Sequence, residues 1–419
     1  MRFTESQIRR SIIALLVLVA VTIETAPANA QKKQPLPIYR SPHFHIRSDM
    51  PADKAKELLQ QLEVMLRGVS AYWGVTQRKV IECNVVDKQS NWRGRGFDES
   101  ALKQTENGAG VTKSQTRRVG GRTFSQSIVW SSAHTNTALH ESVHAYCQMN
   151  FGTTGPTWYA EGMAEIGHFW KEDDPTVNVP PYVLRYIKSS APPTLAQLTD
   201  RNQQTGDSVE NYSWRWALCY MLANNPNYSD RFRVLGLGLL TKQRNTSFPR
   251  VFGSVLEELE FEFRFFLKHV DVGFHAGLAA WNWKAKFKAV KRQATLKSKI
   301  KAKAGWQPSL LRVTEGQAYD YTAEGQWRTA DEQEWLNADG TKEQLGQLVG
   351  TILQDGELVG EIDLGTSGTF TAPHSGNLYL RCRDKWTSLN DNDGTLRVTL
   401  KNSATPIRSD RVGEKESSN

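Results

Sequence analysis

The spacing of apolar residues changes along the chain, and this change constrains the fold more than any other feature of the sequence. Up to residue 269, short alternating segments are followed by apolar side chains at the three-to-four spacing of helices. From 305 to 402 the apolar residues alternate in short runs separated by Gly, Asp and Asn, which is typical of a β-sandwich. The sequence therefore predicts an α+β domain, a small sheet plus a helical half, followed by an all-β sandwich.

The first part of the chain contains the strand patterns and most of the helix patterns. Strands are expected at 43–46, 80–86 and 127–130. Apolar residues at helical spacing predict a helix over 51–73 that ends at Gly74. Residues 88–123 are polar and rich in glycine, which favours a long loop or hairpin. The remaining helices are expected at 136–149, 158–170, 180–189, 212–224, 228–241 and 254–269.

The first thirty residues have the order of a secretory signal. Arg2, Arg9 and Arg10 precede an apolar run over 11–23, and Ala28-Asn29-Ala30 offers the small residues of a cleavage site. The run is too short to span a bilayer comfortably, and no other run approaches that length. We therefore expect cleavage after Ala30 and a secreted or periplasmic protein without a transmembrane segment. An uncleaved N-terminal anchor is the alternative.

The net charge of +8 is concentrated in one short segment. Nine Lys and Arg residues and no acid lie within 281–304, so the remainder of the chain is close to neutral. A nucleic-acid-binding protein is therefore not expected. The segment is interpreted as a solvated helical linker, with adhesion to an anionic polymer or membrane surface as the alternative. The expected division is a signal at 1–30, an α+β domain at 31–280, this basic linker, a sandwich at 305–403 and a disordered tail at 404–419.

The four cysteines lie far apart and form no CxxC pair; they are Cys83, Cys147, Cys219 and Cys382. This spacing disfavours a zinc site built from cysteines. An exported chain allows one disulfide, whose pairing the sequence leaves open. Cys147, three residues after His144, is interpreted as a small buried core residue rather than a metal ligand.

The segment His140-Glu141-Ser142-Val143-His144 carries the strongest chemical signal. Residues four apart share one face of a helix, so both imidazoles can bind one metal ion while Glu141 reaches its bound water. Zinc held by two histidines needs a third protein ligand and an open position for water. Glu161 and Glu165 are the candidates for that ligand. If one of them coordinates zinc, the other can accept a hydrogen bond from a ligand imidazole.

These residues resemble the gluzincin metallopeptidases, the clan of thermolysin and the zinc aminopeptidases, and especially the peptidase-MA-like family of secreted bacterial proteins. The similarity rests on His140-Glu141-x-x-His144 followed by Trp158-x-x-Glu161-Gly162-x-Ala164, and it covers roughly residues 40 to 270. The resemblance implies a thermolysin-like or aminopeptidase-like fold. It also implies that Glu161 is the third zinc ligand and that Glu165 is the hydrogen-bond acceptor behind a ligand histidine.

A further similarity concerns Tyr212-Ser213-Trp214-x-x-Ala217, which resembles the Tyr-Ser-Lys-Gly-Ala helix start of the aminopeptidases. It implies that the Tyr212 hydroxyl donates to the oxyanion; a core aromatic is the alternative. Two features differ from the aminopeptidases. The connection of sixteen residues between His144 and Glu161 is shorter, and the Gly-Ala-Met-Glu-Asn motif that binds the substrate amine is absent. Aminopeptidase specificity is therefore not expected.

The loop 384–394 places several oxygen-bearing side chains within eleven residues, as a calcium site requires. With Gly325-Gln326-Trp327 upstream, it resembles the PA-IL-like galactophilic lectins of bacteria. The resemblance implies a Ca²⁺ ion that also binds galactose-type sugars. The implied ligands are the side chains of Asp384, Asp391 and Asn392 and the backbone carbonyl of Ser388. Asp391 replaces an amide of the family, and a turn rich in Asp and Asn without a metal is the alternative.

The sequence as a whole predicts an exported zinc-dependent endopeptidase that cleaves peptide or protein substrates. Glu141 is the expected general base and Tyr212 the expected oxyanion donor. The sandwich is expected to hold the enzyme at a surface or a glycan. The alternative is a catalytically inactive glycan-binding or envelope protein that uses the peptidase-like domain as a scaffold.

Overall fold

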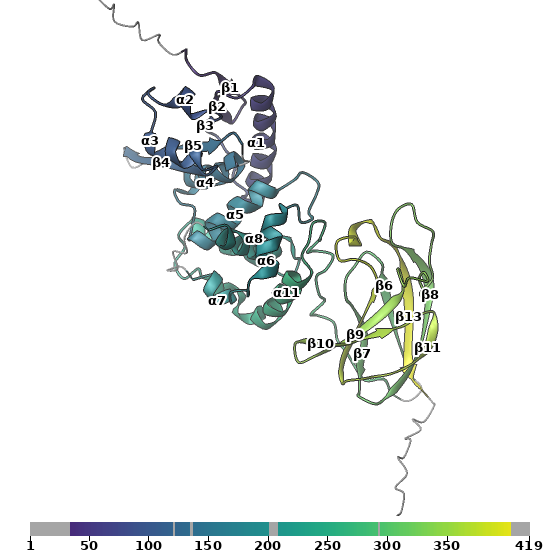
Figure 1. Ribbon diagram of the computed structural model, residues 1–419. Helices are drawn as coiled ribbons and strands as arrows, with labels where there is room; N and C mark the ends of the chain where they lie inside the picture. The colour runs from purple at the N-terminus through teal and green to yellow at the C-terminus, as the bar shows by residue number, and fades with distance from the viewer. Residues whose placement is uncertain (1–33, 120–121, 135–136, 201–207, 292–293, 404–419) are drawn as a thin grey trace, which may run out of the picture. The chain divides into compact units, whose positions relative to one another are not determined.

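The described part of the chain begins with a five-stranded mixed sheet (Figure 1). The computed structural model describes residues 34–119, 122–134, 137–200, 208–291 and 294–403, so the predicted signal and tail lie outside the described residues. The strands are β1 (Ile38–Arg40), β2 (Phe44–Ser48), β3 (Ile81–Val86), β4 (Gly110–Val119) and β5 (Arg122–Ser132). They pair in the order β1-β2-β3-β5-β4. The three central strands are parallel, whereas β1 and β4 pair antiparallel at the two edges.

The first long helix, α1 (Ala52–Trp73), agrees with its sequence pattern. Its apolar positions are buried, as the spacing predicted. The helix ends at Gly74, whose φ of 72° is left-handed and whose N–H donates to Ser70 O. The predictions of this helix, of its end and of the strands now assigned as β2, β3 and β5 are therefore confirmed.

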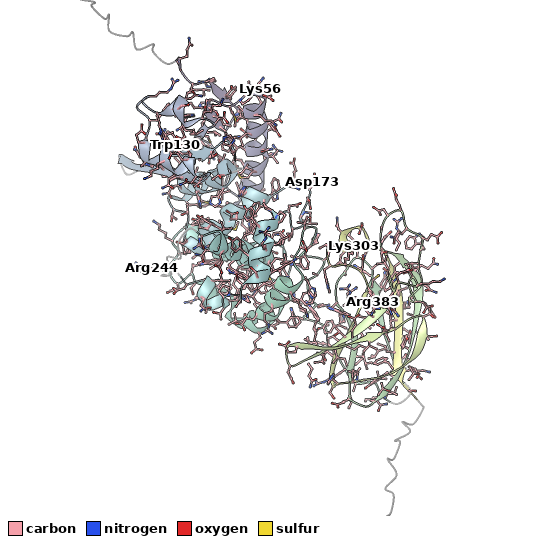
Figure 2. The ribbon with its side chains drawn as sticks, viewed as in Figure 1. Lys56, Trp130, Asp173, Arg244, Lys303 and Arg383 are labelled. Carbon is pink, nitrogen blue, oxygen red and sulfur yellow. The ribbon has the colours of Figure 1, made fainter. Side chains whose placement is uncertain are left out.

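Residues 88–123 contain more regular structure than the predicted loop or hairpin. Two short helices, α2 (Gln89–Trp92) and α3 (Glu99–Glu106), precede β4. The Asp98 side chain accepts a hydrogen bond from the N–H of Ala101 and so begins α3. Trp92 is fully buried in a small cluster with Trp130 of β5, which is labelled in Figure 2. The pattern of polar residues could not indicate this burial, because the partners lie far apart in the sequence.

A run of helices follows the sheet, and these helices share the main apolar core with α1 and with strands β2, β3 and β5. The predicted helices are confirmed close to their expected bounds, and two short helices, α7 and α10, lie between them. The bounds are Thr137–Phe151 for α4, Thr157–Phe169 for α5, Pro181–Ser189 for α6, Leu195–Leu198 for α7, Val209–Asn224 for α8, Ser229–Leu240 for α9, Phe248–Phe252 for α10 and Leu256–His269 for α11. Among the described residues, no helix is both long and apolar enough to cross a membrane.

From Thr295 the described chain forms two antiparallel four-stranded sheets, so the all-β prediction is confirmed. The strands are β6 (Thr295–Lys301), β7 (Gln307–Val313), β8 (Ala318–Arg328), β9 (Leu348–Gln354), β10 (Glu357–Asp363), β11 (Ser367–Thr371), β12 (Gly376–Cys382) and β13 (Asp393–Asn402). One sheet has the order β10-β9-β12-β7 and the other β11-β8-β13-β6. Strands of both sheets contribute to one buried apolar cluster, as in a β-sandwich.

The predicted helical linker at 281–304 is wrong. β6 lies inside that range and pairs with β13 from Thr295 to Lys301. Its side chains alternate strictly between exposed and buried positions, and its lysines occupy only exposed ones. The sandwich therefore begins at Thr295 rather than at 305. The physical reason is that, in the part of the chain that the structure describes, β6 has one neighbouring strand and one buried face, so lysines fit its outward positions.

The four cysteines are buried and free, so the disulfide that the sequence allowed is absent. Burial raises the pKa of each thiol above its ordinary value. All four act as small core residues, which agrees with the interpretation of Cys147.

Candidate metal centre

The candidate ligands and the candidate general base lie on two neighbouring helices. His140, Glu141 and His144 are on α4, and Glu161 and Glu165 are on α5. Glycines allow α5 to pack closely on both sides. A Cβ at Gly167 would lie 2.4 Å from Val143 Cγ2 of α4, and one at Gly162 would lie 2.7 Å from the carbonyl oxygen of Arg215 in α8. This close packing brings the carboxylates of α5 within reach of the imidazoles of α4.

Three potential ligand atoms converge between these helices. The Nε2 atoms of His140 and His144 lie 3.1 Å apart. Glu161 Oε2 lies 3.2 Å from the first and 3.3 Å from the second. Tetrahedral zinc with bonds of about 2.0–2.2 Å holds its ligand atoms about 3.3–3.5 Å apart. The three atoms therefore fit one zinc ion with very little movement, and tetrahedral zinc held by them would have one further position for water.

The charges of this cluster favour a cation at its centre. Burial by itself would lower the pKa of His140, but hydrogen bonds to Glu161 and Glu165 raise it to about 10. Burial would raise the pKa of Glu161, but hydrogen bonds from His140 and His144 hold it well below its ordinary range. In the absence of metal a proton supplies the positive charge. A bound metal ion would replace that proton.

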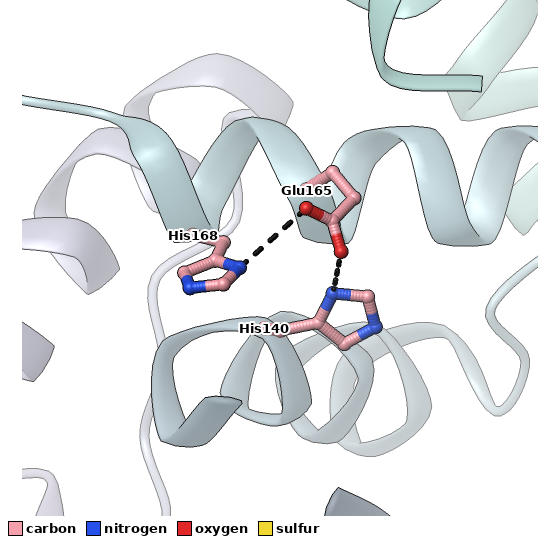
Figure 3. Close-up of side chains that lie close together, drawn as sticks. All are labelled: His140, Glu165 and His168. Atoms are coloured by element: carbon pink, nitrogen blue, oxygen red, sulfur yellow. Dashed lines mark ion pairs between the residues drawn. The ribbon is translucent and has the colours of Figure 1, made fainter. Parts of the chain in front are cut away.

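Glu165 lies behind His140, on the side away from the three converging atoms. Its Oε1 lies 2.9 Å from His140 Nδ1, and its Oε2 lies 3.5 Å from His168 Nδ1 (Figure 3). Burial would raise the pKa of Glu165, but its contacts with the His140 and His168 imidazoles lower it to about 2. The carboxylate therefore holds a proton on His140 Nδ1, so the Nε2 proton is the one that a metal ion would displace.

His168 was not predicted as part of the site. It lies three residues after Glu165 on α5, so both side chains project from one face of the helix. This spacing is the signal that could have found it.

Glu141 contacts the edge strand β4. Thr112 Oγ1 lies 2.7 Å from Glu141 Oε2 and 2.8 Å from the backbone carbonyl oxygen of Glu141, so its single proton is shared between these two acceptors, and Glu141 is 7% exposed. A Cβ at Gly110 would lie 2.7 Å from Glu141 Cγ, so only glycine lets the glutamate lie against this strand. The sequence could not indicate Thr112 or Gly110, because both lie in the segment interpreted as a loop or hairpin.

α8 places Tyr212 beside His140 of the candidate metal centre. The ring centroids of Tyr212 and His140 are 5.8 Å apart, with the ring planes at 81°. The Arg215 guanidinium lies 5.6 Å from the centroid of the Tyr212 ring. Tyr212 is half-buried rather than enclosed in the core. The alternative of a purely core aromatic is therefore not favoured.

The loop 384–394 of the sandwich, which the sequence predicts as a calcium site, contains two buried oxygen atoms. These are Asp384 Oδ2 and Asn392 Oδ1, and both lack a hydrogen-bond partner among the described residues. Asn392 is 3% exposed, and its amide donates to Ala302 O at 3.2 Å. Burial and the nearby charge of Asp391 raise the pKa of Asp384. The Ser388 N–H closes a turn by donating to Lys385 O. Two buried acceptors without donors fit a cation that prefers oxygen ligands, such as Ca²⁺.

The four predicted calcium ligands differ in their surroundings. Asp384 and Asn392 turn an oxygen atom into the protein, Ser388 is half-buried, and Asp391 is exposed.

Comparison with known proteins adds little to this geometry. No known protein family and no curated protein matches this chain. Among solved structures, the chain is similar to the N-terminal domain of EclA, described as a PllA-like lectin. That similarity covers 26% of this chain and 96% of the other, with 19% sequence identity and a TM-score of 0.22. At this TM-score the likeness identifies neither a fold nor a ligand.

Proposed function

We propose that this protein is a zinc-dependent peptidase. The observation that supports this most directly is the convergence of His140 Nε2, His144 Nε2 and Glu161 Oε2 at separations of 3.1–3.3 Å. Two imidazoles and a carboxylate with an open fourth position are the ligand set of a hydrolytic zinc site. A second carboxylate, that of Glu141, lies on the same helix as both histidines and can act as a base.

Glu141 is the general base of the proposed reaction. When bound, zinc would polarise the scissile carbonyl and lower the pKa of the attacking water. Glu141 accepts the proton of that water and later delivers a proton to the leaving amine. The hydroxyl of Thr112 binds Glu141 Oε2, so the other carboxylate oxygen is left for the water. Thr112 thereby fixes the orientation of the base.

Two further residues complete the proposed mechanism. Glu165, supported by His168, holds the His140 ring so that Nε2 faces the ligand set. The hydroxyl of Tyr212 donates a hydrogen bond to the oxyanion that forms on the substrate. Its place beside the His140 ring agrees with this role.

An extended peptide is the substrate that suits this site. β4 is an edge strand, and on one side it has no strand neighbour among the described residues. Thr112 of this strand contacts the general base directly. A peptide that paired with β4 as an added strand would pass next to Glu141, and pairing through the main chain would tolerate many side chains.

The experiment that tests this function compares zinc content and peptide cleavage in purified full-length protein. The wild type should hold about one zinc ion per chain and cleave an unfolded protein such as casein. Glu141→Gln should keep the zinc and lose cleavage, because only the base is removed. Glu99→Gln, an exposed acid on α3, is the matched control and should change neither. Zinc binding without cleavage in the wild type would instead support an inactive scaffold.

For the sandwich, we propose a calcium-dependent glycan site that holds the protein at a surface. The two buried, unpartnered oxygen atoms of Asp384 and Asn392 support this role. Galactose-type sugars should bind in a calorimetric titration only when Ca²⁺ is present. A folded protein that binds no Ca²⁺ would leave the loop as a structural turn.

We also propose that the protein is exported, with cleavage after Ala30. The charged, apolar and small-residue order of residues 1–30 supports this. Intact-mass measurement of the protein recovered from outside the cytoplasm tests it.

A further inference from the structure

The outer face of one sandwich sheet carries a row of basic residues. Along β6 the side chains of Lys297, Lys299 and Lys301 are exposed, and the residues between them are buried. Lys303, labelled in Figure 2, continues this alternation just beyond the strand and is exposed as well. Side chains on one face of a strand are about 7 Å apart, so the three lysines of β6 form a row of regularly spaced positive charges, and Lys303 follows in the turn after the strand.

The neighbouring strand widens this row. In the β6–β13 pairing, Arg397 lies opposite Lys299, and Lys401 lies opposite Thr295. Both basic residues are exposed. We call the six residues the basic stripe: Lys297, Lys299, Lys301, Lys303, Arg397 and Lys401.

Most of the basic stripe has no acidic partner. Lys401 forms an ion pair of 3.8 Å with Asp320. The ion pairs found among the described residues include none of the other five members. The positive charges are therefore available to an external anion.

The charge changes sign at the next strand. On β8, Glu324 lies opposite Arg397 and Asp320 lies opposite Lys401. The positive charge is thus confined to the edge strand and its neighbour, and it is bordered by acids on the third strand. A planar anionic surface laid on the whole sheet would meet these acids, whereas a linear polyanion along β6 would not.

We propose that the basic stripe binds a linear polymer of phosphodiester units that lies along β6. Lysine binds phosphate as a point charge, and a row of lysines at constant spacing suits a chain with repeated charges. From Thr395 to Lys401 on β13, and along all of β6, the outward positions hold only Lys, Arg and Thr. Because no aromatic side chain is available there for stacking on bases, a phosphodiester chain without bases fits better than single-stranded nucleic acid.

The test measures binding of the full-length protein to fluorescently labelled poly(glycerol phosphate) by anisotropy at several salt concentrations. The variant Lys297→Gln/Lys299→Gln/Lys301→Gln removes half of the basic stripe. Binding at low salt should weaken about 100-fold, at about fivefold for each lysine. The plot of log affinity against log salt has a negative slope, and the magnitude of that slope should decrease by about 2. This is about 0.7 for each phosphate that is no longer neutralised by a lysine.

Two control proteins separate the stripe from net charge and from folding. Lys56→Gln/Lys103→Gln/Lys242→Gln changes the charge equally at exposed lysines outside the sandwich, one of which, Lys56, is labelled in Figure 2. It should bind like the wild type. The variant with arginine at 297, 299 and 301 keeps the charge and should retain binding, which excludes a general effect of altering the edge strand.

Four results would overturn the proposal. Equal weakening in both glutamine variants would show that net charge, rather than the stripe, attracts the polymer. Tighter binding of oligo(dT) than of poly(glycerol phosphate) with the same number of phosphates would indicate nucleic acid. Binding to phosphatidylglycerol vesicles with no binding to the soluble polymer would indicate a membrane surface. Absence of binding in the folded wild type would leave the lysines with the single role of preventing edge-to-edge pairing.

Discussion

The roles of the two glutamates on α5 can be separated by replacing each with glutamine. Glu161 and Glu165 lie one turn apart on the same helix, and their side chains are 18% and 13% exposed. The same chemical change is therefore made in nearly the same environment. Only their partners differ. Glu161 faces the Nε2 atoms of both histidines, whereas Glu165 faces Nδ1 of His140 alone among the proposed ligands.

The expected losses of zinc affinity differ by more than an order of magnitude. A zinc site with four ligands contributes about 10–16 kcal/mol, or about 2.5–4 kcal/mol per ligand. An amide is not a usual zinc ligand, so Glu161→Gln should weaken zinc binding by about 100 to 1,000-fold. In Glu165→Gln a charge-assisted hydrogen bond becomes a neutral one. That change costs about 1–1.5 kcal/mol, which is about 5 to 10-fold.

The assay is competition for zinc against a chromogenic chelator, with the zinc content after dialysis as a second measurement. Thermal unfolding of the metal-free proteins controls for folding. The reasoning would be refuted by equal losses in the two variants. A larger loss in Glu165→Gln would exchange the two roles, and unchanged binding in Glu161→Gln would remove this residue from the ligand set.

The other predictions concern catalysis, protons and calcium. Tyr212→Phe should lower kcat by about 100 to 1,000-fold with KM and zinc content unchanged; an unchanged kcat would return Tyr212 to a packing role. Thr112→Val removes a hydrogen bond to a carboxylate and should lower kcat about 10 to 100-fold without loss of zinc, whereas loss of zinc would show that the strand itself had moved. Because the pKa of His140 is raised to about 10, metal-free protein keeps this proton at neutral pH. Zinc binding at pH 7 should therefore release about one proton, and the zinc affinity should fall about tenfold for each pH unit below 7. Calorimetry that gives the same heat of binding in buffers of different ionisation enthalpy would contradict this. Calcium should raise the melting temperature of the wild type but not of Asp384→Ala, and an equal rise in both would place the ion elsewhere.

Local sequence patterns determined the elements and part of the site. The four-residue spacing of His140 and His144 puts both rings on one face of α4, because a helix repeats every 3.6 residues. The same periodicity predicted α1 and its end at Gly74, where a residue with positive φ is needed. These predictions succeed because each depends only on residues within one or two helical turns.

Tertiary structure decided which residues from distant segments meet. Thr112 reaches Glu141 only because β4 pairs with β5 at the edge of the sheet. β6 is a strand only because it pairs with β13, about a hundred residues later in the chain. Its lysines suggested a solvated linker, since a run of charges does not reveal a partner strand. Strand pairing joins residues that are distant in the sequence, and a local pattern carries no information on such partners.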